Sequence, residues 1–169
     1  MVKISDNSVE RPDEQWTYPY MAAVLDYGSN FQVKVAKSSS HSVGYKIGIE
    51  IHVSTKHPTA MGFLDEWCET HGLNHTVREW SDKLRLEVAR REDVERLLRL
   101  VRPYLIARYE ASELILTELI PALNERLPST KEGFIETMDT VDEIRNHLKD
   151  ANSKYDVDYF WNEWDMDSR

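Results

Sequence analysis

Hydrophobic and polar residues alternate along two pairs of short segments in this chain. Residues 31–35 and 47–53 alternate on either side of a polar turn at 38–42, the pattern of a half-buried β-hairpin. Residues 74–80 and 83–89 alternate in the same way and predict a second hairpin. Because only one side of each strand is apolar, we expect one face of the sheet to stay in solvent.

Apolar residues at helical spacing predict helices before, between and after the hairpins. The first covers 18–27, with Thr17 as its cap and Gly28 ending it as a C′ glycine. Further helices are expected over 60–71, 92–101, 105–123 and 131–148, the last opened by a capping box at 129–132. This order predicts an α+β fold of the form αββαββα: a four-stranded antiparallel sheet with helices on one face, followed by C-terminal helices.

The solvent face of the predicted sheet is polar and mostly basic, which is typical of a surface that contacts nucleic acid. Its expected DNA-binding residues are Gln32, Lys34, Lys46, His52, Arg78, Lys83 and Arg85; Glu50 lies on the same face but is not counted among them. His52 could contact a base edge or a phosphate, or it could be an ordinary exposed histidine. Many two-layer α+β proteins show a similar face, so the pattern alone does not establish DNA binding.

Composition and charge change this picture in part. The chain has 169 residues and a net charge of −9, which opposes the cation-driven binding of phosphates. However, 30–57 holds four lysines and one acid, and many acids lie beyond residue 138. No apolar run reaches the ~20 residues of a membrane span, and the single Cys68, expected in the core, excludes an internal disulfide. We expect a cytoplasmic protein with a flexible arm over 1–16, a domain over 17–150 and an acidic, aromatic tail over 151–169.

Residues 21–29, Met-Ala-Ala-Val-Leu-Asp-Tyr-Gly-Ser, resemble the LAGLIDADG motif of homing endonucleases. Phe63-Leu64-Asp65, the helix junction at 101–105 and the segments 127–132, 134–136 and 141–144 also resemble the single-motif, homodimeric members in order and spacing. The resemblance runs from about residue 18 to 148. It implies a saddle-shaped sheet that binds double-stranded DNA.

The resemblance places the catalytic chemistry at positions that this chain has changed. The family's second motif aspartate holds the divalent metal that cuts DNA, and Gly28 stands in its place. A glutamine of the second strand corresponds to Thr55, and an active-site lysine corresponds to Arg108. A degenerate, nuclease-dead site with no cofactor is therefore expected. If the register shifts by two residues, Asp26 becomes the Mg²⁺ ligand of an active enzyme.

The family resemblance also implies a homodimer joined through its motif helices. Ala22 and Ala23 stand at the small-residue positions of that interface, although they could instead pack in the core of their own chain. The tail over 155–167 could bind a protein partner or the DNA groove, or form a last helix packed on the core. Three hypotheses follow: a DNA-binding pseudoenzyme, an active Mg²⁺-dependent endonuclease, and a protein-interaction module without DNA binding.

Overall fold

A computed structural model describes residues 14–149 and 153–166, and these fall into two compact units. Within the described part, the first unit comprises 14–32 and 50–107, and the second comprises 33–49 and 108–166. The region 17–150, expected to be one domain, is thus divided between them. The predicted arm over 1–16 lies mostly outside the described residues, but Glu14–Trp16 form a 3₁₀ turn that continues into the first helix.

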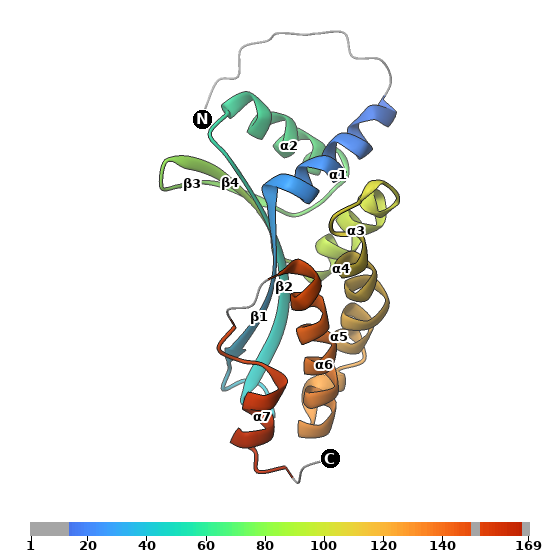
Figure 1. Cartoon of the computed structure of the whole chain (residues 1–169). Coiled ribbons are helices and arrows are strands. Elements are labelled where there is room, and N and C mark those ends of the chain that lie inside the picture. Colours follow the sequence, from blue (N-terminus) through green and yellow to red (C-terminus); the bar gives the residue numbers. More distant parts are fainter. Residues whose placement is uncertain (1–13, 150–152, 167–169) are drawn as a thin grey trace. The chain divides into compact units, whose positions relative to one another are not determined.

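The first unit holds three helices and the second hairpin (Figure 1). Its elements are α1 (Thr17–Gly28), α2 (Pro58–Thr70), β3 (Thr76–Trp80), β4 (Lys83–Val88), α3 (Arg91–Val101) and a 3₁₀ turn at Arg102–Tyr104. Strands β1 (Ser29–Lys37) and β2 (Tyr45–Thr55) supply residues to both units. The four strands form one sheet in the order β1-β2-β4-β3, which confirms the predicted α+β fold with its antiparallel sheet.

Strand pairing in the first unit separates an apolar sheet face from a polar one. Ile51 lies opposite Val88, and Val53 lies opposite Leu86. All four side chains are buried, as expected for the side of the sheet that packs on helices. Their strand neighbours of opposite parity, among them His52 and Arg85, point to the other face.

Gly28 is the last residue of α1 rather than a left-handed C′ residue, which corrects that prediction. Among the described glycines, only Gly44 and Gly72 have positive φ. The backbone turns from helix to strand at Ser29, whose φ of −110° and ψ of 162° are extended. Residues other than glycine could therefore adopt the backbone conformation of Gly28.

The second unit contains a helix interrupted around a proline. In place of one long helix over 105–123, α4 (Tyr109–Leu114), a π-helical turn (Ile115–Leu119) and α5 (Ile120–Asn124) follow one another. The Ile120 N–H bonds to the Ile115 carbonyl, and the next residue, Pro121, has no N–H to donate. Within the described part of the chain, no helix is long and apolar enough to cross a membrane.

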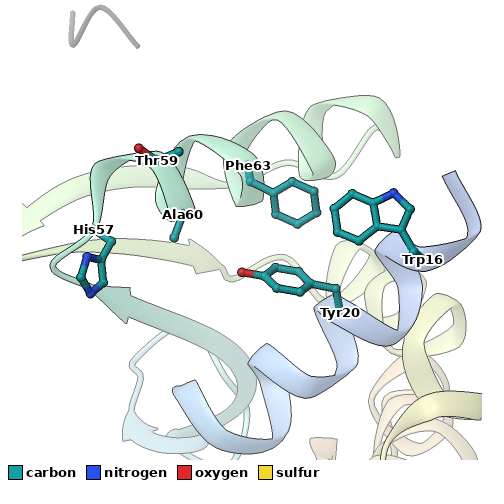
Figure 2. Close-up of a pocket in the computed structure, with 6 residues that line it drawn as sticks. All are labelled: Trp16, Tyr20, His57, Thr59, Ala60 and Phe63. Carbon is teal, nitrogen blue, oxygen red and sulfur yellow. The ribbon is translucent and has the colours of Figure 1, made fainter. Parts of the chain in front are cut away.

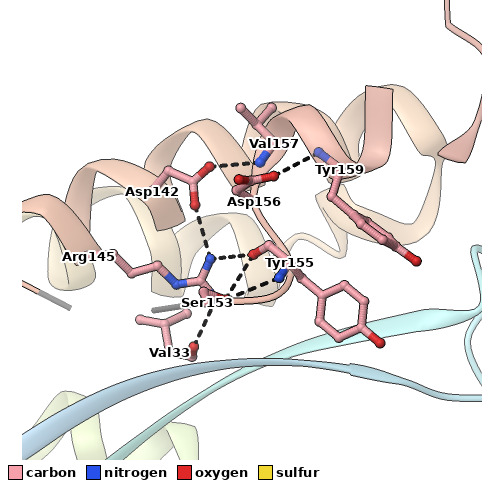
Figure 3. Close-up of polar contacts among 8 residues, drawn as sticks. All are labelled: Val33, Asp142, Arg145, Ser153, Tyr155, Asp156, Val157 and Tyr159. Atoms are coloured by element: carbon pink, nitrogen blue, oxygen red, sulfur yellow. Dashed lines mark hydrogen bonds and ion pairs between the residues drawn. The ribbon is translucent and has the colours of Figure 1, made fainter. Parts of the chain in front are cut away.

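The acidic, aromatic tail folds onto the helix that precedes it, α6 (Lys131–Leu148), and forms α7 (Val157–Glu163). Buried Arg145 donates to the Tyr155 carbonyl at 2.6 Å and to the Val33 carbonyl at 3.3 Å, and contacts Asp142 at 3.0 Å (Figure 3). Asp142 also accepts the Val157 N–H at 2.8 Å. A buried guanidinium is unfavourable without such partners, so these bonds are expected to persist. They hold Tyr155 and Val157 against α6 and thereby fix the start of α7.

Aromatic packing completes this attachment. Phe160 is fully buried, with ring centroids 4.9 Å from Tyr45 and 4.8 Å from Phe134. Trp164 lies 5.4 Å from the Phe134 ring. The hydrogen bond with Tyr159 and, to a smaller extent, burial raise the pKa of Tyr45 above its ordinary value. The alternative of a packed last helix is thus confirmed for 153–166, while residue 167 lies outside the described residues.

Helix α6 begins where the sequence predicts, but its cap is Thr130, one residue after the first residue of the predicted capping box; the Thr130 hydroxyl accepts the Gly133 N–H at 3.1 Å. A Cβ atom at Gly133 would lie 2.1 Å from the Leu127 carbonyl oxygen, far inside van der Waals contact. Glycine is required here because the backbone of the preceding turn approaches so closely.

We therefore expect Gly133→Ala to lower the free energy of unfolding by about 1–3 kcal/mol, the usual cost of overpacking. Chemical denaturation measures the change. Gly48→Ala is the control, since nothing lies within 4 Å of its added methyl group. Equal stabilities for the two variants would contradict the proposed role of Gly133.

Candidate nucleic-acid interface

The polar sheet face of the first unit is built from β2, β4 and β3. Residues directly opposite each other in antiparallel strands point to the same side. The pairs that lie on this face are His52–Glu87, Ser54–Arg85, Arg78–Arg85, Thr76–Glu87 and Trp80–Lys83. Three expected DNA-binding cations, Arg78, Lys83 and Arg85, therefore share one surface.

Ion pairs and ring contacts organise this surface. Arg78 donates to Glu87 at 2.9 Å. The Arg85 guanidinium lies 3.9 Å from the centre of the Trp80 ring, and that of Arg78 lies 5.5 Å from it. Guanidinium groups stack favourably on indole rings, so Trp80 holds both cations near the tip of the hairpin. Lys83 is exposed at the same tip.

His52 lies on the polar face but is only 7% exposed, which corrects its placement as an exposed DNA contact. Its Nε2 atom is 3.1 Å from a Glu50 carboxylate oxygen and 3.6 Å from one of Glu87. The two glutamates cover the imidazole while remaining about one-fifth exposed themselves. The three side chains form a compact group, the Glu50–His52–Glu87 cluster.

The remaining DNA-binding candidates are accessible to different degrees. Gln32 is half-buried in the first unit. Lys34 and Lys46 are exposed on the parts of β1 and β2 that belong to the second unit. In the first unit, Lys56 pairs with Asp82 at the hairpin turn, and this hydrogen bond lowers the pKa of the exposed Asp82 carboxyl.

The positions expected to match the family's catalytic residues belong to no cluster of three metal-ligating side chains among the described residues. Gly28 is exposed and lacks a side chain. Thr55 is half-buried at the end of β2, where its hydroxyl accepts the His57 N–H at 3.1 Å. Arg108, half-buried, belongs to the second unit. Neither Thr55 nor Arg108 supplies the carboxylate that Gly28 lacks.

Asp26, the ligand in the alternative register, has a structural partner. It is 8% exposed, and its Oδ2 accepts the backbone N–H of Ile106 at 2.8 Å. The carboxylate thereby ties α1 to the segment that follows the 3₁₀ turn Arg102–Tyr104. This bond favours a structural role for Asp26 over metal binding.

The two alanines expected at a dimer interface differ in exposure. Ala22 is 0% exposed and packs in the core of its own chain, which was the alternative considered for it. Ala23 is exposed. Tyr20, 42% exposed, and Tyr27, 83% exposed, follow the same helical spacing as Ala23. The exposed side of α1 therefore presents Tyr20, Ala23 and Tyr27.

An open pocket of about 430 Å³ lies between the start of α1 and α2 (Figure 2). Trp16 stacks on Phe63 with ring centroids 5.5 Å apart, and Tyr20 meets the same ring edge-on at 5.0 Å. His57 is the only titratable side chain among its lining residues besides Tyr20. The pocket thus lacks the paired acids and bases of a hydrolytic site.

Cys68 lies in the core, as expected, and burial raises its pKa to about 12, with Asp65 adding to the shift. Two residues that contact the charged side chains of the polar face, Trp80 and Glu87, were not singled out from the sequence as site residues. Both follow the period of two that identified Arg78 and Arg85, so the same pattern could have found them. The cross-strand approach of Glu87 to His52 depends on register, which the pattern does not specify.

The hydrogen bond of Asp26 leads to a stability prediction. Asp26→Ala removes the partly buried, charge-assisted hydrogen bond to the Ile106 N–H and should lower the free energy of unfolding by about 1–3 kcal/mol. Asp26→Asn retains a side-chain oxygen and should lose less. Thermal unfolding of both variants measures the difference. Unchanged stability in Asp26→Ala, together with loss of a Mg²⁺-dependent cleavage, would instead favour the shifted register.

The fold matches solved structures of homing endonucleases with little sequence identity. Similar structures include I-CvuI in complex with the I-CreI target (16% identity, TM-score 0.72, 91% of this chain and 98% of that one). They also include the archaeal intron-encoded I-Vdi141I complexed with DNA (13% identity, TM-score 0.76, 92% of this chain and 100% of that one). A third is the I-SmaMI LAGLIDADG homing endonuclease bound to cleaved DNA (14% identity, TM-score 0.63, 82% of this chain and 50% of that one).

No protein-family model matches the sequence, and neither does any curated protein. The structural similarity agrees with the resemblance of residues 21–29 to the family's motif. This chain has the fold of the LAGLIDADG homing endonucleases.

Proposed function

We propose that this protein binds double-stranded DNA as a homodimer, through the polar face of its sheet, and cleaves that DNA weakly or not at all. The observation that carries the proposal is the group Arg78, Lys83, Arg85 and Trp80 on one solvent-facing surface. Lysine and arginine displace the counterions of phosphates, and arginine can also contact base edges. A sheet that leaves such a face uncovered offers them to a duplex.

The similar structures support this role. I-CvuI and I-Vdi141I match this chain over almost their full lengths and are in complex with DNA. The negative net charge is compatible with binding because position decides which charges meet the phosphates. Two acids of the C-terminal region are used structurally: Asp142 of α6 binds Arg145 and Val157, and Asp156 of the tail caps α7.

The proposed loss of cleavage is based on the absence of a carboxylate at Gly28. Metal-assisted phosphodiester hydrolysis uses carboxylates to hold the ions that activate water and stabilise the leaving oxygen. Glycine offers no ligand, and the nearby motif carboxylate, Asp26, is bound to the Ile106 N–H. Together with the changes at Thr55 and Arg108, this favours a binding protein over an active, Mg²⁺-dependent endonuclease.

A homodimer is supported by two observations. This chain covers 50% of the I-SmaMI chain, so that protein has room for a second domain of similar size. The apolar side chains Tyr20, Ala23 and Tyr27 lie on one exposed side of α1, as expected of a helix that packs on another copy. A protein-interaction module using the tail is less favoured, since Phe160 is buried.

The test of this function separates binding from cleavage. The protein is incubated with a pooled duplex library in EDTA, and bound duplexes are recovered and sequenced. The same library is then incubated with Mg²⁺ and assayed for strand breaks. Recovery of duplexes without breaks supports the proposal. Robust cleavage would favour the endonuclease, and no recovery of any duplex would favour the interaction module.

Single removal of Lys83 or Arg85 should weaken binding to a recovered duplex. Each lost phosphate contact lowers the slope of log affinity against log salt by about one unit. Fluorescence anisotropy over a salt series measures both effects. Glu79→Gln is the control, because Glu79 pairs with Leu84 and points to the opposite sheet face. Equal affinities for Lys83→Ala, Arg85→Ala and wild type would place the duplex elsewhere.

Sedimentation tests the dimer. We expect the wild type to sediment as a dimer at micromolar concentration and Ala23→Glu to sediment as a folded monomer, because a buried, unpaired carboxylate opposes association. Circular dichroism checks the fold of the variant. A monomeric wild type would exclude the proposed interface.

Gly28→Asp should create Mg²⁺-dependent nicking of a recovered duplex. The substitution is sterically free, because nothing lies within 4 Å of the added Cβ and Gly28 has no positive φ. Adding Thr55→Gln and Arg108→Lys should raise the activity further. Nicking is measured on a supercoiled plasmid, with Gly28→Asn as the uncharged control. If all variants stay inactive while binding DNA, loss of the carboxylate is not what abolishes cleavage.

A further inference from the structure

We infer that the Glu50–His52–Glu87 cluster is a binding site for a divalent transition-metal ion of the Zn²⁺ class. The cluster lies on the polar sheet face of the first unit, on the central strands β2 and β4. It differs from Gly28, Thr55 and Arg108 in the chemistry that it offers. One imidazole nitrogen and two carboxylate oxygens converge there.

The spacing of the ligand atoms fits one ion. His52 Nε2 lies 3.1 Å and 3.6 Å from the nearest oxygens of Glu50 and Glu87, and all three ligand atoms lie within 4.8 Å of one another. Atoms that bind Zn²⁺ tetrahedrally at about 2.0–2.2 Å are roughly 3.4 Å apart. An ion can therefore be bound with small side-chain movements and no change of the backbone.

The protein already restrains these ligands. His52 is buried, and its pairing register sets it directly opposite Glu87. Arg78 binds the same Glu87 oxygen at 2.9 Å and thereby orients that carboxylate. Because Arg78 is about half exposed, its side chain can swing away when an ion takes over the charge of Glu87.

The ligand types select the ion. Imidazole favours Zn²⁺ and its neighbours in the first transition row, whereas Mg²⁺ prefers an all-oxygen octahedral set. Three protein ligands leave at least one coordination position for water or another group. Glu50 and Glu87 are each about one-fifth exposed, so the ion is reachable from the solvent side of the sheet.

A bound ion would change the charge of the surface that we propose binds DNA, so this consequence rests on the proposed function. Glu50 and Glu87 together bear two negative charges next to Arg78 and Arg85, and these repel phosphates. A divalent ion offsets them and releases Arg78 from Glu87. Zn²⁺ should therefore tighten DNA binding even where no strand is cut.

The direct test uses the metal-free, full-length protein without DNA. Calorimetric titration with Zn²⁺ should show one site per chain, and titration with Co²⁺ should produce visible d–d absorption bands. Glu50→Gln and Glu87→Gln should each weaken Zn²⁺ binding at least tenfold, since loss of a supporting partner alone costs about 10- to 100-fold. Mg²⁺ should compete poorly.

Matched controls separate this site from others on the molecule. Glu79→Gln changes the same residue type on the opposite face of β3, and Asp65→Asn removes the carboxylate paired with His75 at 2.6 Å. Both should bind Zn²⁺ as the wild type does. Circular dichroism in EDTA confirms that each variant is folded.

Absence of Zn²⁺ heat and of Co²⁺ bands, or equal affinities in wild type, Glu50→Gln and Glu87→Gln, would overturn the inference. DNA affinity is measured separately, by fluorescence anisotropy in Zn²⁺ and in EDTA. Zn²⁺ binding by a protein that binds no duplex under either condition would sustain the metal site and overturn the proposed function.

Discussion

The pairing of β2 with β4 is the constraint on which the rest of the first unit depends. Side chains along a strand alternate between faces, so a register slip of one residue would exchange the two faces of the sheet. The observed register buries Ile51 and Val88 against helices. It also sets His52 beside Glu87 and Arg85 beside Ser54 on the polar side. Core packing therefore fixes the candidate interface without any interaction that is specific to DNA.

Because core packing positions the polar face, residues that stabilise the fold can be distinguished from exposed residues that are available for binding. Asp26 and Arg145 are buried charged groups that bond to backbone atoms of distant segments, so their loss would act through stability. Lys83 and Gly28 are exposed, and nothing lies within 4 Å of a Cβ atom added at Gly28. Substitutions at these two positions can thus alter binding or chemistry while leaving the core intact.

The sequence predicted the elements well because their periodicities are strong. The hairpins and the helix over 131–148 appear as expected, since alternation and the polar residues that precede a helix are local signals. The π-helical turn before Pro121 was not predicted, because helix type depends on how the backbone relaxes. Gly28 was mistaken for a left-handed residue, since its φ depends on the path into β1.

The candidate site was less predictable because it arises from contacts across strands. Arg78, Lys83 and Arg85 follow from alternation alone. The burial of His52 does not, since it results from two glutamates, one of them on a different strand. The exposure of Ala23 and the burial of Ala22 likewise follow from how α1 packs, which the motif resemblance left open.

Site-specific photo-crosslinking tests the central claim most directly. A photoreactive residue replaces either Lys83 or Glu79, which are both exposed on one hairpin but point to opposite faces. The account predicts that position 83 crosslinks to a bound duplex and that position 79 does not. Crosslinking from position 79 alone, or equally from both, would contradict binding through the polar sheet face.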